Sequence, residues 1–143
     1  MSSVDAVSAW ESLFRAQVAV MRQLAVEFPR SMSLNEYDVL FNLSRAPERR
    51  CRLRDLTQQV LLTQPSISRL VDRLVVRGLV EKWPDATDGR GTLVGLTPAG
   101  LEAFRTVAIE HARSIERRVG SALDGDELDE LKRLTDKLRR GDT

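Results

Sequence analysis

The sequence has very little cysteine and histidine, the residues that build zinc sites, disulfides and many covalent catalytic centres. Cys51 and His111 are the only cysteine and the only histidine among 143 residues. A single cysteine excludes an internal disulfide, and one residue of each kind cannot supply a structural zinc site or a Cys/His/Asp nucleophile arrangement. No acid/base pair or phosphate-binding loop stands out. The sequence therefore predicts a protein that is not an enzyme and has no metal or cofactor.

Long apolar segments are lacking as well. No apolar stretch approaches roughly 18 residues, the length that a membrane span needs, and the N-terminus lacks the basic and apolar segments of a secretory signal. We therefore expect a soluble, cytoplasmic protein. Hydrophobic residues make up 42% of the chain, which suffices for one domain with a small core that gains from dimerisation.

The net charge of +1 conceals an uneven distribution. Residues 45–90 contain ten arginines and lysines against six acidic residues, so this segment carries +4 and the rest of the chain −3. A local excess of cationic side chains is what the binding of phosphate groups requires. For residues 45–54 alone, an ordinary solvated loop explains the charge equally well.

Apolar residues recur three and four positions apart near the N-terminus, which predicts a long first helix with one buried stripe that ends at Pro29. The stripe consists of Trp10, Leu13, Phe14, Val18, Met21, Leu24, Ala25 and Phe28. Ser33 and Glu36 have the spacing of a capping box, so a second helix is expected over about residues 34–43. Its inward residues are Tyr37, Leu40 and Phe41.

Two further helices joined by a tight turn are expected in the middle of the chain. The first is short, with inward residues Leu53, Leu56 and Val60. Thr63 caps the second helix with its hydroxyl group, and Pro65 in the first turn costs no helical hydrogen bond. The core side of this helix consists of Ile67, Leu70, Val71 and Leu74. Gly78 ends it by adopting a left-handed backbone conformation.

A β-hairpin and two more helices complete the chain. Residues 79–83 and 92–96 have the composition of strands, and residues 84–91 form the loop between them. Thr97-Pro98 opens a fifth helix, and a second capping-box spacing at Asp124 opens the sixth. The apolar stripes of these helices are Leu101, Phe104, Ala108, Ala112, Ile115 and Val119, then Leu128, Leu131, Leu134 and Leu138.

Two helices joined by a tight turn and followed by a hairpin make a winged helix-turn-helix, so the fold class is mainly α with a small β-hairpin wing. The second of the two helices is the candidate recognition helix. With its core side turned inward, helical geometry aims the opposite side toward the DNA major groove. The candidate DNA-binding residues on this helix are Gln64, Pro65, Ser66, Ser68, Arg69 and Arg73.

The side chains on the outward face differ in what they can recognise. Arg69 can bind guanine O6 and N7 with two guanidinium nitrogens, and Gln64 can bind adenine in the same way. The two serines suit phosphates or either base and discriminate less. Asp72 is expected to pair with Arg69 or Arg73 and to fix its orientation, and a plain surface ion pair is an equal alternative.

The hairpin loop carries Arg90 between Gly89 and Gly91. Because neither neighbour has a side chain, the guanidinium group can enter a minor groove about 6 Å wide, and a narrow A·T groove would hold the cation. Asp88 is expected to accept a hydrogen bond from Arg90 and orient it. Asp-Gly is also a common hairpin-turn dipeptide, but its place directly after a recognition helix favours DNA binding.

Three short motifs have the order Gly78-Leu79-Val80, Asp88-Gly89-Arg90 and Leu96-Thr97-Pro98-Ala99-Gly100. In this order and spacing the chain resembles the MarR (multiple antibiotic resistance regulator) family of bacterial transcription factors, and the helix order fits over essentially the whole chain. The resemblance implies that Arg90 is the minor-groove residue, that Asp88 is its partner, and that the helix over 64–73 reads the major groove.

The resemblance also implies an obligate homodimer that binds a pseudo-palindromic operator, with the first helix and the last two helices of each subunit interlocked. The apolar stripes on these helices are too long for a small winged-helix core to cover, which indicates a dimer independently. One continuous domain then divides into a helical dimerisation region, 1–30 and 97–143, and a DNA-binding region, 31–96.

Members of this family often sense phenolic or acidic small molecules, so we expect an effector of this class. The urate-responsive subgroup has a first-helix tryptophan and an aspartate ahead of the helix-turn-helix, which Trp10 and Asp55 match, but its wing arginines have no counterpart here. The candidate effector-binding residues are Trp10, Tyr37 and Asp55.

Cys51 is a separate candidate sensor, because some relatives sense oxidants through a cysteine. Arg50 and Arg52 flank it and are expected to lower the pKa of its thiol. The oxidant-sensing relatives carry their reactive cysteine in the first helix, and a lone cysteine is typical of a structural role, so both interpretations stay open.

The leading interpretation is a homodimeric, sequence-specific transcriptional regulator that binds double-stranded DNA. We expect an effector-responsive repressor, whose operator affinity falls when an effector changes the spacing of the two recognition helices. The alternative is a winged-helix protein-interaction module that does not read DNA and uses its basic face for an acidic partner.

Overall fold

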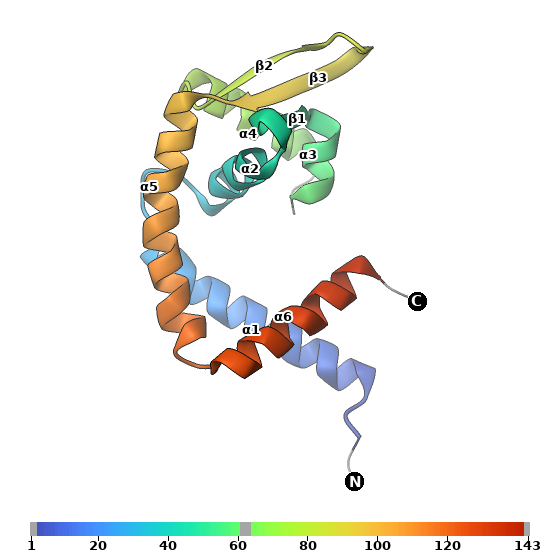
Figure 1. Cartoon of the computed structure of the whole chain (residues 1–143), viewed down its shortest axis with the longest axis vertical. Coiled ribbons are helices and arrows are strands. Elements are labelled where there is room, and N and C mark those ends of the chain that lie inside the picture. Colours follow the sequence, from blue (N-terminus) through green and yellow to red (C-terminus); the bar gives the residue numbers. More distant parts are fainter. Residues whose placement is uncertain (1–2, 61–63, 142–143) are drawn as a thin grey trace. The chain divides into compact units, whose positions relative to one another are not determined.

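The computed structural model describes residues 3–60 and 64–141, and the predicted capping residue Thr63 lies outside them. The described elements are labelled in Figure 1. In chain order they are α1 (Ala6–Glu27), α2 (Leu34–Arg45), a 3-10 turn η1 (Pro47–Arg49), β1 (Arg50–Arg52), α3 (Leu53–Gln59), α4 (Gln64–Val76), β2 (Val80–Asp85), β3 (Asp88–Leu96), α5 (Pro98–Ile115), a π-helical turn η2 (Glu116–Gly120) and α6 (Gly125–Arg140).

The chain forms two compact units. One runs from Pro29 to Glu110, and the other combines the chain up to Phe28 with the chain from His111 onward. The second boundary falls inside α5, whereas the predicted DNA-binding region ends at residue 96. That prediction concerns which residues contact DNA or a second subunit, and compactness does not decide it. None of the helices in the described part is both long and apolar enough to cross a membrane.

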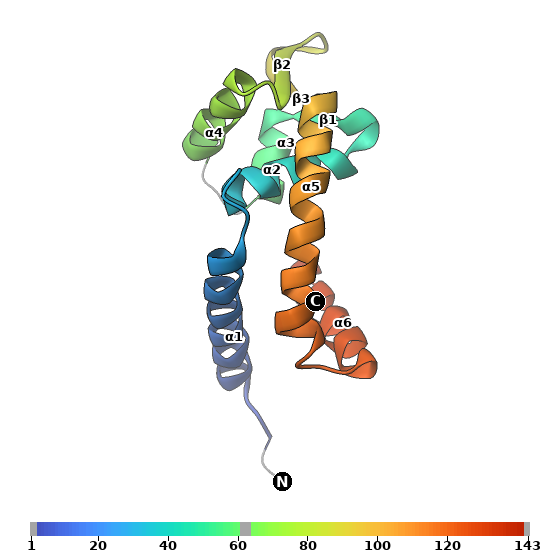
Figure 2. The same ribbon diagram turned by 90° about the vertical axis from the view of Figure 1, so that its left-hand side faces the viewer.

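The core of the unit Pro29–Glu110 (the winged-helix unit) is built by the helices that the sequence predicts. The four inward residues of α4 are almost fully buried, as are residues of α2, α3 and the sheet. The buried set comprises Val39, Leu40, Leu43, Leu56, Ile67, Leu70, Val71, Leu74, Val80 and Val94. α2 and α3 pack against β3, and α4 packs against β2 (Figure 1, Figure 2). This packing fixes which side of α4 faces outward.

The predicted capping signals in this unit are confirmed. At the start of α2, the Ser33 hydroxyl accepts from Glu36 N at 3.0 Å, and the Glu36 carboxylate accepts from Ser33 N at 2.8 Å. Gly78 ends α4 with a φ of +74°, in the left-handed region that favours glycine. The Thr97 hydroxyl accepts from Gly100 N at 2.9 Å and donates to Gly78 O at 2.7 Å. The start of α5 is therefore tied to the end of α4.

The sheet contains a strand that the sequence analysis missed. The three strands are antiparallel in the order β1-β3-β2, with Cys51 and Lys82 both opposite Val94. β1 has only three residues, two of them arginines, so no alternation of apolar and polar residues marks it. The segment 45–54 is therefore not a plain solvated loop, because its middle part is paired with β3.

The predicted hairpin loop over residues 84–91 is wrong. β2 continues to Asp85 and β3 begins at Asp88, so the turn consists of Ala86 and Thr87 alone. The Asp85 carboxylate accepts from Thr87 N at 3.0 Å and from the Thr87 hydroxyl at 2.8 Å, and these bonds close the turn. Arg90 consequently belongs to β3 and not to the tip of the wing.

The other unit, up to Phe28 and from His111 (the terminal-helix unit), has little core of its own. On α1 only Leu24 is buried, although the sequence predicts a buried stripe. Trp10 is 58% exposed and Phe14 50% exposed, and on α6 the exposed fractions are 44% for Leu134 and 67% for Leu138. The expectation of a buried stripe is thus wrong for the single chain, because the described helices of this unit offer too little surface to cover it.

Glu27, at the end of α1, holds this helix to the turn η2 within the terminal-helix unit. Its carboxylate accepts from Arg117 Nη2 at 2.9 Å and also pairs with Arg118. The hydrogen bonds from Arg117, from the buried Ser114 and from Arg118 lower the pKa of Glu27 to about 2. His111, in the same unit, packs edge-to-face on Phe28 with ring centroids 5.1 Å apart, and burial lowers the pKa of its imidazole. These contacts hold the parts of the terminal-helix unit together.

Glu27→Gln is expected to reduce stability at neutral pH and to have no effect near pH 2. A carboxylate whose pKa is lower in the folded state stabilises the fold above its unfolded pKa, near 4.5, and loses that contribution as the pH falls toward 2. Urea unfolding of both proteins between pH 2 and 7 measures the difference. Glu11→Gln is the matched control, because the ion pair of Glu11 with Arg15 is exposed. A difference that stays constant over this range contradicts the assignment.

Candidate nucleic-acid interface

The outward face of α4 is polar and accessible, as predicted. Arg69 and Arg73 are exposed, and Ser66 and Ser68 are half-buried on the flanks. The opposite face fills the core, so the helix cannot rotate without exposing Ile67 and Leu74. The side chains of Gln64 and Pro65, also predicted to contact DNA, lie outside the described part of the structure.

Asp72 does not pair with Arg69 or Arg73, which corrects the prediction. Its carboxylate pairs with Lys82 Nζ, from β2. β2 packs beside α4, which brings Lys82 within reach of Asp72. Among the described residues, Arg69 and Arg73 have no carboxylate partner, so both guanidinium groups are available to an external anion.

A buried carboxylate holds the wing to the rest of the winged-helix unit. Asp85 is 5% exposed and pairs through Oδ2 with Arg52 Nε at 2.8 Å. The Arg52 guanidinium also donates to the Thr87 hydroxyl at 3.2 Å. Hydrogen bonds from Thr87 and the charge of Arg52 lower the pKa of Asp85. This contact was not predicted, because β1 was not predicted and Arg52 lies 35 residues from Thr87 along the chain.

The side chains of Asp88 and Arg90 are not among those the structure describes, so their predicted pairing stays a prediction. The backbone of both residues belongs to β3. A Cβ atom added at Gly89 would meet no atom within 4 Å. Packing within the chain therefore gives no reason for a glycine at this position.

Arg77 has a structural role at the other end of α4. Its guanidinium pairs with the Glu36 carboxylate at 2.9 Å and donates to Ser31 O at 2.7 Å. These two bonds connect the last turn of the helix region to the start of α2. The cationic residues near α4 thus fall into two groups: Arg77 and Lys82 hold the fold together, and Arg69 and Arg73 point outward.

Comparisons with known proteins match this arrangement. Residues 30–91 match the model of the MarR family. The multiple antibiotic resistance protein MarR of Salmonella typhimurium is 30% identical over 73 residues, which are 51% of this chain and 51% of that protein. The crystal structure of AbsC, a MarR family transcriptional regulator from Streptomyces coelicolor, is 26% identical with a TM-score of 0.81, and covers 99% of this chain and 100% of its own. These matches show that the chain is similar to MarR family proteins in sequence over part of its length and in fold over nearly all of it.

The matches support the resemblance and confirm the fold class, mainly helical with a small antiparallel sheet. The chain spans about half the length of the curated MarR relatives it matches. Two further solved structures share the fold. Sco3205 from Streptomyces coelicolor, solved in complex with DNA, is 24% identical with a TM-score of 0.83, covering 99% of this chain and 91% of its own. PcaV from the same organism, solved with its natural ligand, is 26% identical with a TM-score of 0.73, covering 98% of each chain.

The three candidate effector residues are divided between the two units. Trp10 belongs to the terminal-helix unit, and Tyr37 and Asp55 belong to the winged-helix unit. The Tyr37 ring stacks on Phe104 with centroids 5.2 Å apart, and burial raises the pKa of its phenol. Asp55 lines a cavity of about 550 Å³ together with Cys51. The assignment of an effector to these residues stays a prediction.

The thiol of Cys51 is not activated, which corrects the prediction. Burial and the nearby charge of Asp55 raise the pKa of Cys51. The flanking arginines do not offset this, because Arg50 pairs with Glu48 and Arg52 with Asp85. A thiol with a raised pKa is a poor nucleophile at neutral pH. In the described part of the chain no cluster of His, Cys, Asp and Glu could hold a metal ion.

Proposed function

We propose that this chain is a member of the MarR family and a homodimeric, sequence-specific DNA-binding transcriptional regulator. In this proposal it is an effector-responsive repressor that acts on a pseudo-palindromic operator in the cytoplasm. The observation that carries the proposal is the two-sided character of α4. Its apolar side is buried in the core. Its outward side presents Arg69 and Arg73, which have no carboxylate partners among the described residues. A helix of this kind fits the major groove and can donate to base edges.

The wing supports the proposal in a second way. β3 places Arg90 beside Gly89, where no contact within the described part of the chain requires a glycine. A glycine there leaves room for a close approach from outside, such as by the walls of a minor groove. The Arg52–Asp85 pair and the Lys82–Asp72 pair hold the hairpin against β1 and α4. The wing and recognition helix would then meet DNA as one rigid surface.

The solved relatives provide further support. Structures of Sco3205 and of a MarR mutant from E. coli were determined with DNA, and BpsR of Bordetella bronchiseptica has its DNA binding regulated by 6-hydroxynicotinic acid. The fold that these proteins share with this chain is thus compatible with both activities. A DNA-binding regulator needs no chemistry on its ligand, so the proposal includes no enzymatic activity.

The first test selects a site from random DNA duplexes and measures its affinity by fluorescence anisotropy. Arg69→Ala is expected to weaken binding about tenfold to hundredfold, because a bidentate contact to guanine is worth about 1–3 kcal/mol. Arg90→Ala should weaken binding to all sequences and reduce the slope of log affinity against log salt by about 1. Arg22→Ala, an exposed change on α1, is the matched control.

The alternative outcome of this test is equally definite. If the wild-type protein selects no sequence, or if both variants keep full affinity, the chain does not read DNA through this surface. A protein-interaction module that binds an acidic partner would then be the better interpretation.

A further inference from the structure

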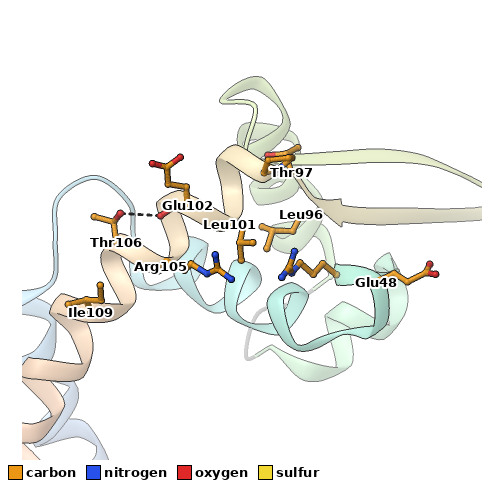
Figure 3. A pocket seen from close by; sticks show the side chains of 10 residues that line it. Glu48, Leu96, Thr97, Leu101, Glu102, Arg105, Thr106 and Ile109 are labelled. Atoms are coloured by element: carbon orange, nitrogen blue, oxygen red, sulfur yellow. Dashed lines mark hydrogen bonds between the residues drawn. The ribbon is translucent and has the colours of Figure 1, made fainter.

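A cavity of about 530 Å³ lies in the winged-helix unit, apart from the proposed DNA-binding residues and the predicted effector residues (Figure 3). It is bounded by the turn η1, the end of β3 and the first half of α5. The residues that matter for its chemistry are Arg49, Leu96, Leu101, Arg105 and Ile109. A volume of this size is within the usual range for small-molecule sites.

The cavity presents two cations that the chain does not neutralise. Arg105 comes from α5 and Arg49 from η1, and neither forms an ion pair within the described residues. Glu48 is paired with Arg50 instead. Figure 3 shows the Glu102 carboxylate pointing away from Arg105, while Arg105 and Leu101 point toward η1. Two guanidinium groups in one cavity favour an anion, above all a carboxylate, whose geometry suits the planar guanidinium.

The backbone holds Arg49 in an unusual conformation. Glu48 and Arg49 have φ values of +56° and +57°, the only positive values among the described non-glycine residues. Arg49 N donates to Ala46 O at 2.9 Å, and β1 begins at the next residue. Left-handed conformations of such residues are uncommon and are concentrated at binding sites. The strained turn fixes the position from which Arg49 reaches the cavity.

The remaining wall is apolar. Leu96 and Leu101 are half-buried, and Ile109 is an exposed branched residue one turn beyond Arg105. An inorganic anion would leave this wall uncovered, whereas an organic acid covers it with its hydrocarbon part. We propose that the cavity binds a small organic monocarboxylate, with its carboxylate on Arg49 and Arg105 and its apolar body against Leu96, Leu101 and Ile109.

Binding at this position has a route to the wing. β1 follows Arg49 directly and pairs with β3, and β3 ends at Leu96 in the cavity wall. A ligand that bridges η1 and α5 therefore contacts the start of β1 and the end of β3, two paired strands of the sheet that carries the wing. This regulatory consequence rests on the proposed function, whereas the binding itself does not.

The binding test uses the full chain without DNA and cyclohexanecarboxylate as the probe, titrated by methyl NMR. The methyl signals of Leu96, Leu101 and Ile109 are expected to shift, and those of Leu131 and Leu138 on α6 are not. Cyclohexanecarboxamide, which lacks the charge, and acetate, which lacks the apolar body, should each bind at least about tenfold more weakly.

Variants separate the site from a general charge effect. Arg49→Gln and Arg105→Gln are each expected to lower the affinity for the probe about tenfold, because each loses a charged hydrogen bond. Arg54→Gln, an exposed change on α3 away from the cavity, is the matched control. Unchanged thermal unfolding shows that the variants fold. Equal binding of carboxylate and carboxamide, shifts confined to α6, or unchanged affinity in both variants would overturn the site.

The regulatory part has a separate measurement. Affinity for the selected DNA is expected to change when cyclohexanecarboxylate is added to the wild type and to stay constant in Arg105→Gln. If the probe binds the cavity but leaves DNA affinity unchanged, the proposed coupling to DNA binding is contradicted. The proposed binding site is then still supported. If no DNA is selected at all, the NMR titration still decides whether the site exists.

Discussion

Gly100→Ala is expected to lower the free energy of unfolding by about 3 kcal/mol, the upper end of what overpacking costs. A Cβ atom at position 100 would lie 1.9 Å from Leu79 O, 2.8 Å from Leu79 C and 2.9 Å from Leu96 Cδ1. The nearest of these atoms belong to the backbone, so a side-chain rotation cannot relieve the overlap. The first turn of α5 would have to move away from the residue that precedes β2.

The same displacement would break the two hydrogen bonds of the Thr97 hydroxyl, which tie the start of α5 to the end of α4. The Thr97 hydroxyl accepts a hydrogen bond from Gly100 N and donates one to Gly78 O, at the end of α4. Thr97 N also donates to Leu79 O at 3.2 Å, the atom with which the new Cβ would collide. We therefore expect Gly100→Ala to disturb the wing as well as to destabilise the fold. Amide signals of β2 and β3 should shift along with those of α5.

Gly125→Ala is the matched control. Gly125 also lies in the first turn of a helix, α6, and a Cβ atom there would meet no atom within 4 Å. Alanine is therefore expected to leave stability unchanged or to raise it by at most about 1 kcal/mol. Urea unfolding of the two variants and the wild type measures the contrast. Equal stability of both variants would show that α5 does not approach Leu79 this closely.

Local sequence signals predicted the helices and their ends well, because these signals act over a few residues. The capping boxes at Ser33 and Asp124 form as expected, and the spacing of Ile67, Leu70 and Leu74 predicted the buried side of α4. Gly100 belongs to one of the motifs that carry the resemblance, and the fold gives the physical reason for a glycine at this position. The sequence contains the glycine, but only the fold brings Leu79 O against it.

Contacts between distant residues were predicted poorly. Asp72 pairs with Lys82 across two elements, and a helix-spacing argument cannot find a partner on a strand. The pKa of the Cys51 thiol was predicted to be lowered, but it is raised. The arginines on either side of Cys51 in sequence pair instead with Glu48 and Asp85. The cavity at Arg49 and Arg105 had no sequence signal, since the two residues are far apart along the chain.

The exposed stripe of the terminal-helix unit leads to the second large effect. Trp10 and Leu13 of α1 and Leu131, Leu134 and Leu138 of α6 line an apolar groove of about 530 Å³. Monomeric proteins rarely leave contiguous apolar surface of this kind exposed. If a second copy covers it, as we propose, each change in the stripe acts twice in the dimer, because a two-fold interface contains every residue twice.

Leu134→Asp is therefore expected to raise the dimer dissociation constant more than about a hundredfold. Two buried leucines, each worth about 1.5 kcal/mol or more, would be replaced by carboxylates. Val26→Asp is the matched control, because Val26 is 87% exposed and lies on the opposite side of α1 from Trp10. Sedimentation over a dilution series of the three proteins measures the change.

The dimer can also be tested without any variant. When folding and association are coupled, the thermal unfolding midpoint rises with protein concentration. A wild-type midpoint that is independent of concentration, together with a monomeric mass, would contradict the dimer. If the dimer is confirmed, Leu134→Asp should also weaken binding to a selected two-half-site DNA much more than binding to a single half-site. The second recognition helix contributes only when both copies are held at the spacing of the two half-sites.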